Sequence, residues 1–512
     1  MIEDVKLFAK RHTNALFVNG IMACICYLHM VFSLNVGIDT ERIIQDEGAL
    51  LDSWKAVGRQ GLLLSKAVWT PGGYNPYFAG LLFLAGFILL GAFIAFLCWT
   101  VSGKDDSYPY GLFMVLFTVC PAWMPQFYFS LQRTEVVFGM FYAVVSVFAL
   151  SRLIYFTGNK VVWTVLGLVS GVWSFCTYQG CVAFYIGLCI IIFLMDFART
   201  YEEKLWKEYA IAIFKLIGGF AVIYIVNTVI TRLFFGMDIY LQGQIAWGKA
   251  PLSEIMGYIV KHMAKVMLWG LGRVEYSSAY PFMCLFLAIV FFSFCRKRAI
   301  NKSVKFVLFL ALAGLALTPF LMTIYTGNQL VARSQFALQL VAAFGCMFAY
   351  GIWKKKEGAG YQWVCRAALV ICVVVIWLNV STISRLLYTD DVRYQEDVRV
   401  ASQIAEDVQR MPGAEGLPII CVGGYGAHLN HAARGADMYG VSFLAWDYTP
   451  ANLAGATGRV VGIMNTLGID IAGTLDYKDE AIALSREMEH YPNQGYISVQ
   501  DNYVIVKLSE IE

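Results

Sequence analysis

Residues 77–99 read "YFAGLLFLAGFILLGAFIAFLCW", a run without a single charged side chain. Because a helix needs about 20 apolar residues to cross the hydrocarbon core of a bilayer, this run predicts a transmembrane helix. The same criterion finds about eleven such spans along the chain. The others are 13–35, 109–128, 134–155, 161–177, 180–197, 210–235, 281–295, 305–326, 330–352 and 366–388. The pair at 161–197 can also be read as one re-entrant hairpin, and 281–295 is short.

The composition agrees with a membrane protein that has many spans. Of the 512 residues, 59% are hydrophobic and only 15% are charged, whereas a soluble protein carries roughly a quarter charged residues. The net charge of +3 is too small to suggest a nucleic-acid partner. The 13 cysteines mostly lie inside apolar runs, and their spacing predicts neither a disulfide framework nor a zinc site.

The basic residues predict how the spans are oriented. If the N-terminus is cytoplasmic, the inner segments hold most of the lysines and arginines, as the positive-inside rule expects. These are Lys104, Arg152, Lys160, Arg199, Lys204, Lys207, Arg296, Lys297, Arg298, Lys302, Lys354, Lys355, Lys356 and Arg366. The short outer loops hold little beyond Arg133 and Arg333. An odd number of spans then puts residues 389–512 outside the cytoplasm.

The chain divides by composition into two expected domains. Residues 1–388 form the transmembrane domain, and residues 389–512 form a small extracytoplasmic α/β domain. In the tail, "LPIICVGG" (417–424) reads as a buried strand. The stretches 450–467 and 478–490 read as helices, and "GYISVQDNYVIVKL" (495–508) reads as two strands around an Asp-Asn turn.

Two outer loops, 36–76 and 236–280, are long and mix apolar with charged residues at helical spacing. Such segments tend to lie in the membrane interface with their apolar face toward the lipid. Two interpretations stay open. The loops are either a surface layer or the roof of an active-site cavity in the outer leaflet, and we expect the roof.

Ionisable residues gather at the outer ends of the spans, where they are candidates for function because charge at membrane depth is costly. Asp39 and Glu41 directly follow the first span. The further candidates for substrate binding are Arg59, Gln60, Lys66, Arg133, Glu135, Arg273 and Arg333. A carboxylate there can act as general base toward a hydroxyl, and arginines can hold a phosphate through charge-assisted bonds. A transferase that takes a sugar from a lipid-phosphate donor needs both.

Each of these residues also has a simpler interpretation. The acid pair on its own reads as a solvated helix cap, and Arg133 and Arg333 on their own read as interfacial anchors. The amides Gln179, Asn227 and Gln329 lie near outer span ends, where they line the cavity or join helices by hydrogen bonds.

Outside the cytoplasm there is neither ATP nor a nucleotide sugar, so a transferase working there needs a donor carried across on a lipid.

The sequence resembles the bacterial type II glucosyltransferases, which are associated with O-antigen and other cell-surface polysaccharides. Four motifs carry the resemblance, in order along essentially the whole chain. They are "GIDTE" (37–41), "GRQG" (58–61), "RSQFALQLV" (333–341) and "GYISVQDNYVIVKLSE" (495–510). The resemblance implies a GT-C type membrane glycosyltransferase of the bacterial cell (inner) membrane, with a catalytic acid in the first outer loop. That role falls on Asp39, with its neighbour Glu41 as the alternative base.

The resemblance also implies the reaction. A hexose, glucose in this family, moves with inversion from a polyprenyl-phosphate sugar to a polysaccharide or glycolipid acceptor on the outer face. We expect no cofactor and no metal, because arginines can neutralise the leaving phosphate. Two alternatives are a lipid or glycolipid transporter and a polysaccharide polymerase or ligase. A transporter is expected to show inverted repeats and polar groups at mid-bilayer, and the charges here lie at one border.

Overall fold

The computed structural model describes residues 1–156, 158–234, 243–269, 279–297 and 300–511. The chain forms two compact units, each assembled from separate stretches of sequence. The first unit comprises Met1–Phe32, Leu51–Phe127 and Gln132–Ile383. The second comprises Ser33–Leu50, Tyr128–Leu131 and Ser384–Glu512. The first long loop is therefore divided between the two units.

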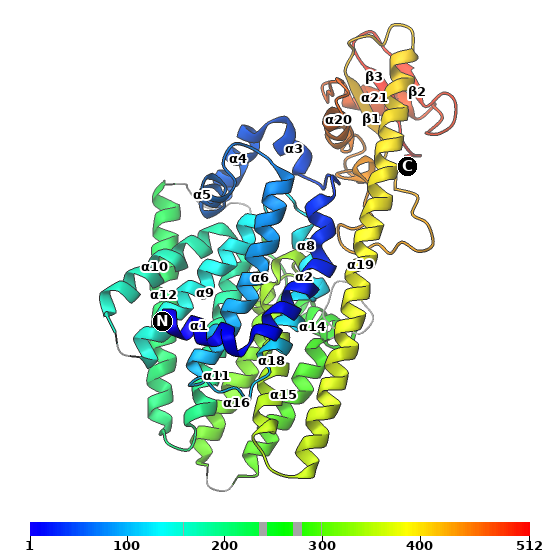
Figure 1. Cartoon of the computed structure of the whole chain (residues 1–512). Helices are drawn as coiled ribbons and strands as arrows, with labels where there is room; N and C mark the ends of the chain where they lie inside the picture. The colour runs from blue at the N-terminus through cyan, green and yellow to red at the C-terminus, as the bar shows by residue number, and fades with distance from the viewer. Residues whose placement is uncertain (157, 235–242, 270–278, 298–299, 512) are drawn as a thin grey trace. The chain divides into compact units, whose positions relative to one another are not determined.

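The first unit is a bundle of helices (Figure 1). Its long helices are α2 (Thr13–Phe32), α6 (Pro76–Val101), α9 (Arg133–Tyr155), α10 (Lys160–Thr177), α11 (Gly180–Thr200), α12 (Trp206–Phe234), α14 (Leu252–Trp269), α15 (Ala279–Cys295), α16 (Lys302–Leu317), α18 (Phe336–Lys354) and the first part of α19 (Ala359–Arg410). Shorter pieces are α1 (Ile2–Arg11), α4 (Glu47–Ala56, which the division crosses), α5 (Gln60–Trp69), α7 (Tyr110–Thr118), α8 (Met124–Phe127), α17 (Leu321–Thr326) and the 3₁₀ turns η1 (Pro121–Trp123), η2 (Thr318–Phe320) and η3 (Ala332–Ser334).

Among the described residues, nine helices are long and apolar enough to cross a membrane. A tenth candidate is the pair α7 and η1–α8, which is bent by 46° where Pro121 interrupts the helical hydrogen bonds. The short apolar helix α15 falls below this length criterion. The structure therefore confirms a protein with many helical spans, whereas the expected count of eleven is not confirmed. The stretch 161–197 forms two separate helices, α10 and α11.

Several helix starts follow directly from local sequence. Asn75 precedes α6, and its side chain accepts a hydrogen bond from the backbone N–H of Phe78. Pro76 occupies the first helical position. Asn159 and Asn301 cap α10 and α16 in the same way. An asparagine side chain in this position satisfies one of the N–H groups that a helix start leaves without a partner.

The second unit contains a three-stranded sheet packed with short helices beside the later part of α19 (Figure 1). Its elements are α3 (Thr40–Gln45), β1 (Ile419–Val422), the 3₁₀ turn η4 (Phe443–Ala445), α20 (Thr457–Thr466), α21 (Lys478–Ser485), β2 (Ile497–Val499) and β3 (Val504–Lys507). The strand order is β1-β3-β2, with β1 parallel to β3 and β2 antiparallel to it. The expected small α/β region is confirmed, including both strands around the Asp-Asn turn.

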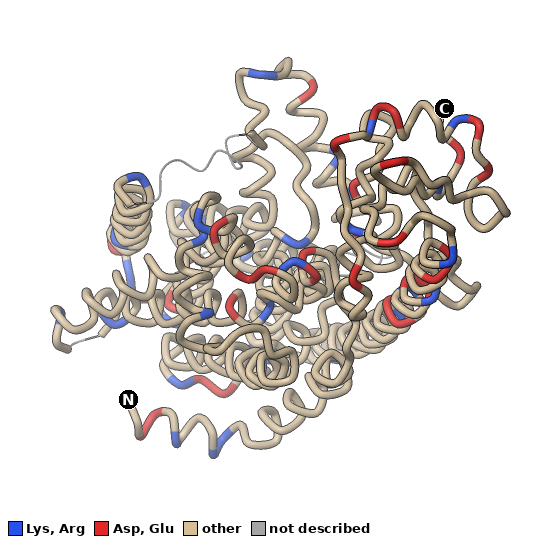
Figure 2. The backbone as a smooth tube through the Cα atoms, turned by 90° about the horizontal axis from the view of Figure 1, so that it is seen from above, with Lys and Arg blue, Asp and Glu red and all other residues tan. Residues whose placement is uncertain are grey.

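The core of the sheet follows from its sequence. Both β1 and β3 are buried along their whole length, as continuous apolar runs predict for strands covered on two faces. Ile420 on β1 pairs with Ile505 on β3, and Tyr503 and Ala481 complete the cluster. Charged residues are sparse along the helices of the first unit and frequent in the second (Figure 2).

Candidate active site

The acid pair "IDTE" lies in the second unit at the start of α3. Asp39 precedes the helix with a positive φ of 67°, a backbone conformation that asparagine and aspartate tolerate better than other side chains. Two residues earlier, a Cβ added at Gly37 would lie 2.8 Å from Cε1 of Tyr128 and 3.0 Å from its carbonyl oxygen. Glycine at 37 therefore lets the chain pass close to Tyr128 before it turns into α3.

Arg393 on α19 anchors the segment that carries the acids. Its guanidinium donates to the carbonyl oxygen of Val36 from both terminal nitrogens, at 3.2 and 3.3 Å. The side chain is fully buried and also pairs with Asp390 and Asp397. Asn35 adds a hydrogen bond to Asp391 at 2.7 Å. The stretch before Asp39 is thus fixed to α19 by charge-assisted bonds, which are among the stronger hydrogen bonds in proteins.

Arg459 on α20 lies at the centre of three carboxylates. Its Nη1 is 3.1 Å from Oδ1 of Asp39 and also contacts Oε1 of Glu41. Its Nε donates to Oδ2 of Asp447 at 2.8 Å. Asp447, like Asp39, has a positive φ, of 64°. Strained backbone of this kind is often found at functional sites, and both residues contact the same guanidinium.

A close approach of α20 to α3 makes this cluster possible. A Cβ added at Gly462 would lie 2.9 Å from Cγ of Glu41. The carbonyl oxygen of Gly462 accepts a hydrogen bond from Nε2 of Gln45 at 2.7 Å. The glycine therefore allows the two helices to meet at the residue that carries the buried acid.

The two acids differ in their exposure and electrostatics. The side chain of Asp39 is 40% exposed, whereas that of Glu41 is only 2% exposed. Burial raises the pKa of Glu41, although the positive charge of Arg459 opposes this shift. Burial works against the charge on Arg459, but Glu41 and Asp39 together raise its pKa, so it stays a cation. Of the two acids in "IDTE", Asp39 is therefore the one whose carboxylate a large substrate can reach.

Arg459 and Asp447 are not among the residues predicted from the sequence. Arg459 is 420 positions from Asp39, and nothing in "GRVVG" (458–462) marks it as a partner of an acid near the N-terminus. The available signal was weak: a single arginine between glycine and valine on a helix that is otherwise uncharged. No group of three histidine, cysteine, aspartate or glutamate side chains is arranged as a metal site within the described ranges. The expectation of a metal-free reaction stays a prediction.

"GRQG" lies in the first unit, where each of its residues has a local role. Gly58 ends α4 with a φ of 74°, a conformation that favours glycine. The guanidinium of Arg59 lies 4.9 Å from the centre of the Tyr178 ring. Nε2 of Gln60 donates to Oγ1 of Thr231 on α12 at 2.8 Å. A Cβ added at Gly61 would be 2.7 Å from Thr177 N, so glycine lets α5 start against the end of α10.

Lys66 and Glu135 form a buried ion pair in the first unit. Nζ of Lys66 is 3.3 Å from Oε1 of Glu135, and both side chains are buried. The same oxygen accepts a hydrogen bond from Thr70 at 2.8 Å. The pair joins α5 to the first turn of α9, where the positive end of the helix dipole also favours a carboxylate.

Arg133 is buried beside α2. It donates to the carbonyl oxygen of Met30, which lies in the last turn of α2 and has no partner further along that helix. Its guanidinium also lies 5.2 Å from the centre of the Phe83 ring. This contact is a sufficient structural reason for an arginine here, and its expected role in phosphate binding stays a prediction.

The remaining predicted residues are placed as follows. Arg333 is half-buried in η3, and Arg273 lies outside the described residues. Asp39 and Glu41 belong to the second unit, whereas Arg59, Gln60, Lys66, Arg133, Glu135 and Arg333 belong to the first. The structure thus brings together Asp39 with Glu41, and Lys66 with Glu135. Gln329 belongs to neither of these two pairs. Its Oε1 accepts a hydrogen bond from Lys265 at 3.0 Å.

The fold defines a multi-pass helical membrane protein with a small α/β region and a carboxylate–arginine cluster. The family model for glucosyl transferase GtrII matches residues 28–350. This match covers more than half of the chain, which therefore belongs to that family, and the resemblance inferred from the sequence motifs is confirmed. The matched region includes Asp39 and Glu41 and ends before Arg459. No curated protein and no solved structure matches the chain.

Membership of this family implies a membrane glucosyltransferase that modifies cell-surface polysaccharide. An enzyme of this kind needs a sugar donor and a glycan acceptor. A purely transporting role is not what the family match indicates.

Proposed function

We propose that this protein is an inverting GT-C glycosyltransferase that moves glucose from a polyprenyl-phosphate sugar to a cell-surface polysaccharide or lipid-linked glycan on the outer face of the membrane. The observation that carries the proposal is the acid pair at the start of α3, within the region matched by the family, where one carboxylate is reachable and the other is buried against Arg459. We retain eleven spans, a cytoplasmic N-terminus and an extracytoplasmic tail as parts of the proposal.

In this mechanism Asp39 is the general base. Its carboxylate takes the proton from an acceptor hydroxyl as that oxygen attacks the anomeric carbon of the donor. The bond from the anomeric carbon to the phosphate oxygen breaks, and its electron pair leaves with the polyprenyl monophosphate. Asp39 keeps the proton until water removes it. Proton transfer by a positioned side chain contributes about 10²–10⁴-fold to a rate.

Glu41 and Arg459 position the base. Nη1 of Arg459 contacts both Asp39 and the buried Glu41. In this proposal the contact fixes the direction of the Asp39 carboxylate. Neither residue needs to touch the sugar for this role. The arginines of the first unit, Arg59 above all, remain the proposed partners of the leaving phosphate.

The test is a transfer assay with purified protein in proteoliposomes. The donor is polyprenyl-phosphate [¹⁴C]glucose, and the acceptor is surface polysaccharide isolated from cells that lack this gene. We expect radioactive polysaccharide with the glucose donor and much less with the matching galactose donor. Transfer from UDP-glucose in the absence of the lipid donor, or labelled lipid crossing the bilayer without any transfer, would overturn the proposal.

A further inference from the structure

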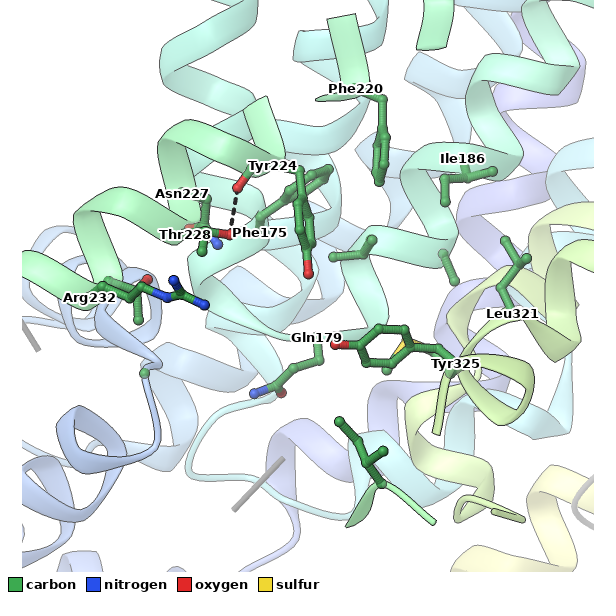
Figure 3. Close-up of a pocket in the computed structure, with 16 residues that line it drawn as sticks. Phe175, Gln179, Ile186, Phe220, Tyr224, Asn227, Thr228, Arg232, Leu321 and Tyr325 are labelled. Atoms are coloured by element: carbon green, nitrogen blue, oxygen red, sulfur yellow. Dashed lines mark hydrogen bonds between the residues drawn. The ribbon is translucent and has the colours of Figure 1, made fainter. Parts of the chain in front are cut away.

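A pocket of about 560 Å³ lies in the first unit among α10, α11, α12 and α17 (Figure 3). Its volume is in the range of about 300–1,000 Å³ that is usual for ligand pockets. The helices that line it are all candidate membrane spans or parts of one. The pocket is partly open to the surface, and Gly58 of "GRQG" is the residue of the four motifs that lies in its lining.

The inner part of the pocket is apolar and aromatic. Figure 3 shows Phe220, Ile186 and Leu321 on its walls, with Phe175 and Tyr325 beside them. Aromatic faces and branched aliphatic side chains make a surface suited to a hydrocarbon chain. Such a surface offers little to a free sugar, which needs a partner for each of its hydroxyls.

Along α12 the lining changes from apolar to polar to cationic. In chain order it contributes Phe220, Tyr224, Asn227, Thr231 and Arg232, at spacings of three or four residues for the first four, so these lie on one face of the helix. Arg232 is in the last turn of α12, where a cation is favoured by the helix dipole.

Residues from two other segments complete the polar end. Gln179 comes from the short turn between α10 and α11, and Gly58 comes from the start of "GRQG". Gln60 of the same motif bonds Thr231 on the pocket wall. Oδ1 of Asn227, a residue of the lining, is buried and accepts no hydrogen bond from the described residues. Such amide oxygens are partners for donors, which sugar hydroxyls supply.

We propose that this pocket binds a single-chain isoprenoid monophosphate, with the chain among the aromatic residues and the phosphate at Arg232. The inference rests on the proposed function, because a lipid-phosphate donor is the substrate for which such a graded pocket is suited. It adds a location for the donor and a residue, Arg232, that was not among the expected phosphate ligands.

The test uses a diazirine-bearing polyprenyl monophosphate as a photoaffinity probe on the full-length protein in nanodiscs. We expect crosslinks on the peptides that carry Phe220 and Phe175. Unlabelled polyprenyl monophosphate should compete at least about tenfold better than the polyprenol without phosphate, because charge-assisted bonds are lost with the phosphate. Phosphatidylglycerol and inorganic phosphate serve as further competitors, and both should be weak.

Two variants and two matched controls sharpen this test. Ile186→Trp fills the pocket and should reduce crosslinking about tenfold, whereas Ile225→Trp, at an exposed position of α12 outside the lining, should not. Arg232→Gln should remove most of the preference for the phosphate over the alcohol, whereas Lys215→Gln, exposed on the same helix, should keep it.

Equal labelling of the two tryptophan variants overturns the proposal, as does phosphatidylglycerol competing as well as the polyprenyl monophosphate, because the pocket is then an ordinary lipid cleft. The fate of the proposed function is read separately in the transfer assay. Phosphate-dependent crosslinking without any glucose transfer leaves the pocket assignment standing and contradicts the function. Transfer that is unaffected by Ile186→Trp contradicts the pocket and leaves the function standing.

Discussion

Arg459 on α20 donates a hydrogen bond to Asp39, 420 positions earlier in the chain, at 3.1 Å. The same nitrogen contacts Glu41, which is almost completely buried. One guanidinium from the C-terminal tail thereby holds both acids of the motif that the sequence marks as catalytic. The tail is therefore part of the candidate active site.

Replacing Arg459 should destabilise the second unit and reduce transfer. Arg459→Ala leaves Glu41 buried without its cation, and breaking a buried ion pair by removing one partner costs about 3–5 kcal/mol. Arg459→Lys keeps the charge but loses the separate hydrogen bond from Nε to Asp447, so it should recover much of the stability and less of the activity. Thermal unfolding in detergent and initial transfer rates measure the two effects. If Ala and Lys variants behave alike, charge is not what Arg459 contributes.

Gly462 and Gly458 offer a matched pair on one helix. A Cβ at Gly462 would collide with Glu41, whereas a Cβ at Gly458 meets nothing within 4 Å. We therefore expect Gly462→Ala to lower transfer about ten- to a hundredfold by displacing the acids, and Gly458→Ala to leave it nearly unchanged. Equal losses in both variants would show that helix propensity, rather than the contact with α3, is responsible.

The raised pKa of Glu41 should make the folding stability of the protein depend on pH. Burial holds its pKa above the ordinary glutamate value, so its contribution to stability is fully present below about pH 4.3 and is lost as the pH rises through the folded-state pKa. The Glu41→Gln protein cannot ionise at this position. Its melting temperature relative to that of the wild type should therefore be higher at about pH 7.5 than at about pH 4.3. Melting temperatures of both proteins across this range provide the measurement, and a difference that changes in the opposite direction contradicts the assignment.

The effects of Lys66 and Glu135 on the free energy of unfolding of the first unit should be coupled. Lys66→Met strands a buried carboxylate and should cost about 3–5 kcal/mol, while the double variant Lys66→Met/Glu135→Leu should recover most of that loss. The free energies of unfolding of the two single variants and the double variant form a mutant cycle. Additive losses would mean that the two side chains do not interact. If Lys66 also binds donor phosphate, as the sequence suggests, the double variant should remain inactive despite regaining stability.

How far the sequence predicts this protein differs between its parts. The sequence correctly predicts a protein with many helical spans, although not their number, because a membrane helix is a local property, set by about 20 apolar residues in a row. The sheet of the tail is found because β1 and β3 are short apolar runs bounded by turn residues. The expected domain boundary between residues 388 and 389 stays a prediction, and this position lies within α19, which runs from Ala359 to Arg410.

The candidate site is predicted only in its first half. Asp39 and Glu41 can be recognised because acids directly after a span are rare and costly. Their partner Arg459 cannot, because the contact depends on how α20 packs against α3, which depends in turn on Gly462. For Arg133 the sequence indicates a charge at membrane depth but not that it contacts the carbonyl oxygen of Met30. Pairings between distant segments are set by tertiary packing, which local patterns do not contain.

The most direct test of the account is glucose transfer by Asp39→Asn, measured in proteoliposomes with polyprenyl-phosphate [¹⁴C]glucose and surface polysaccharide. Asparagine tolerates the positive φ of this position and keeps the shape of the side chain, so the variant should fold normally. The exposed acid Asp46, changed to asparagine, is the matched control. The account predicts a loss of about 10²–10⁴-fold for Asp39→Asn and little change for Asp46→Asn. Full transfer by the Asp39→Asn protein would contradict the assignment of Asp39 as the base.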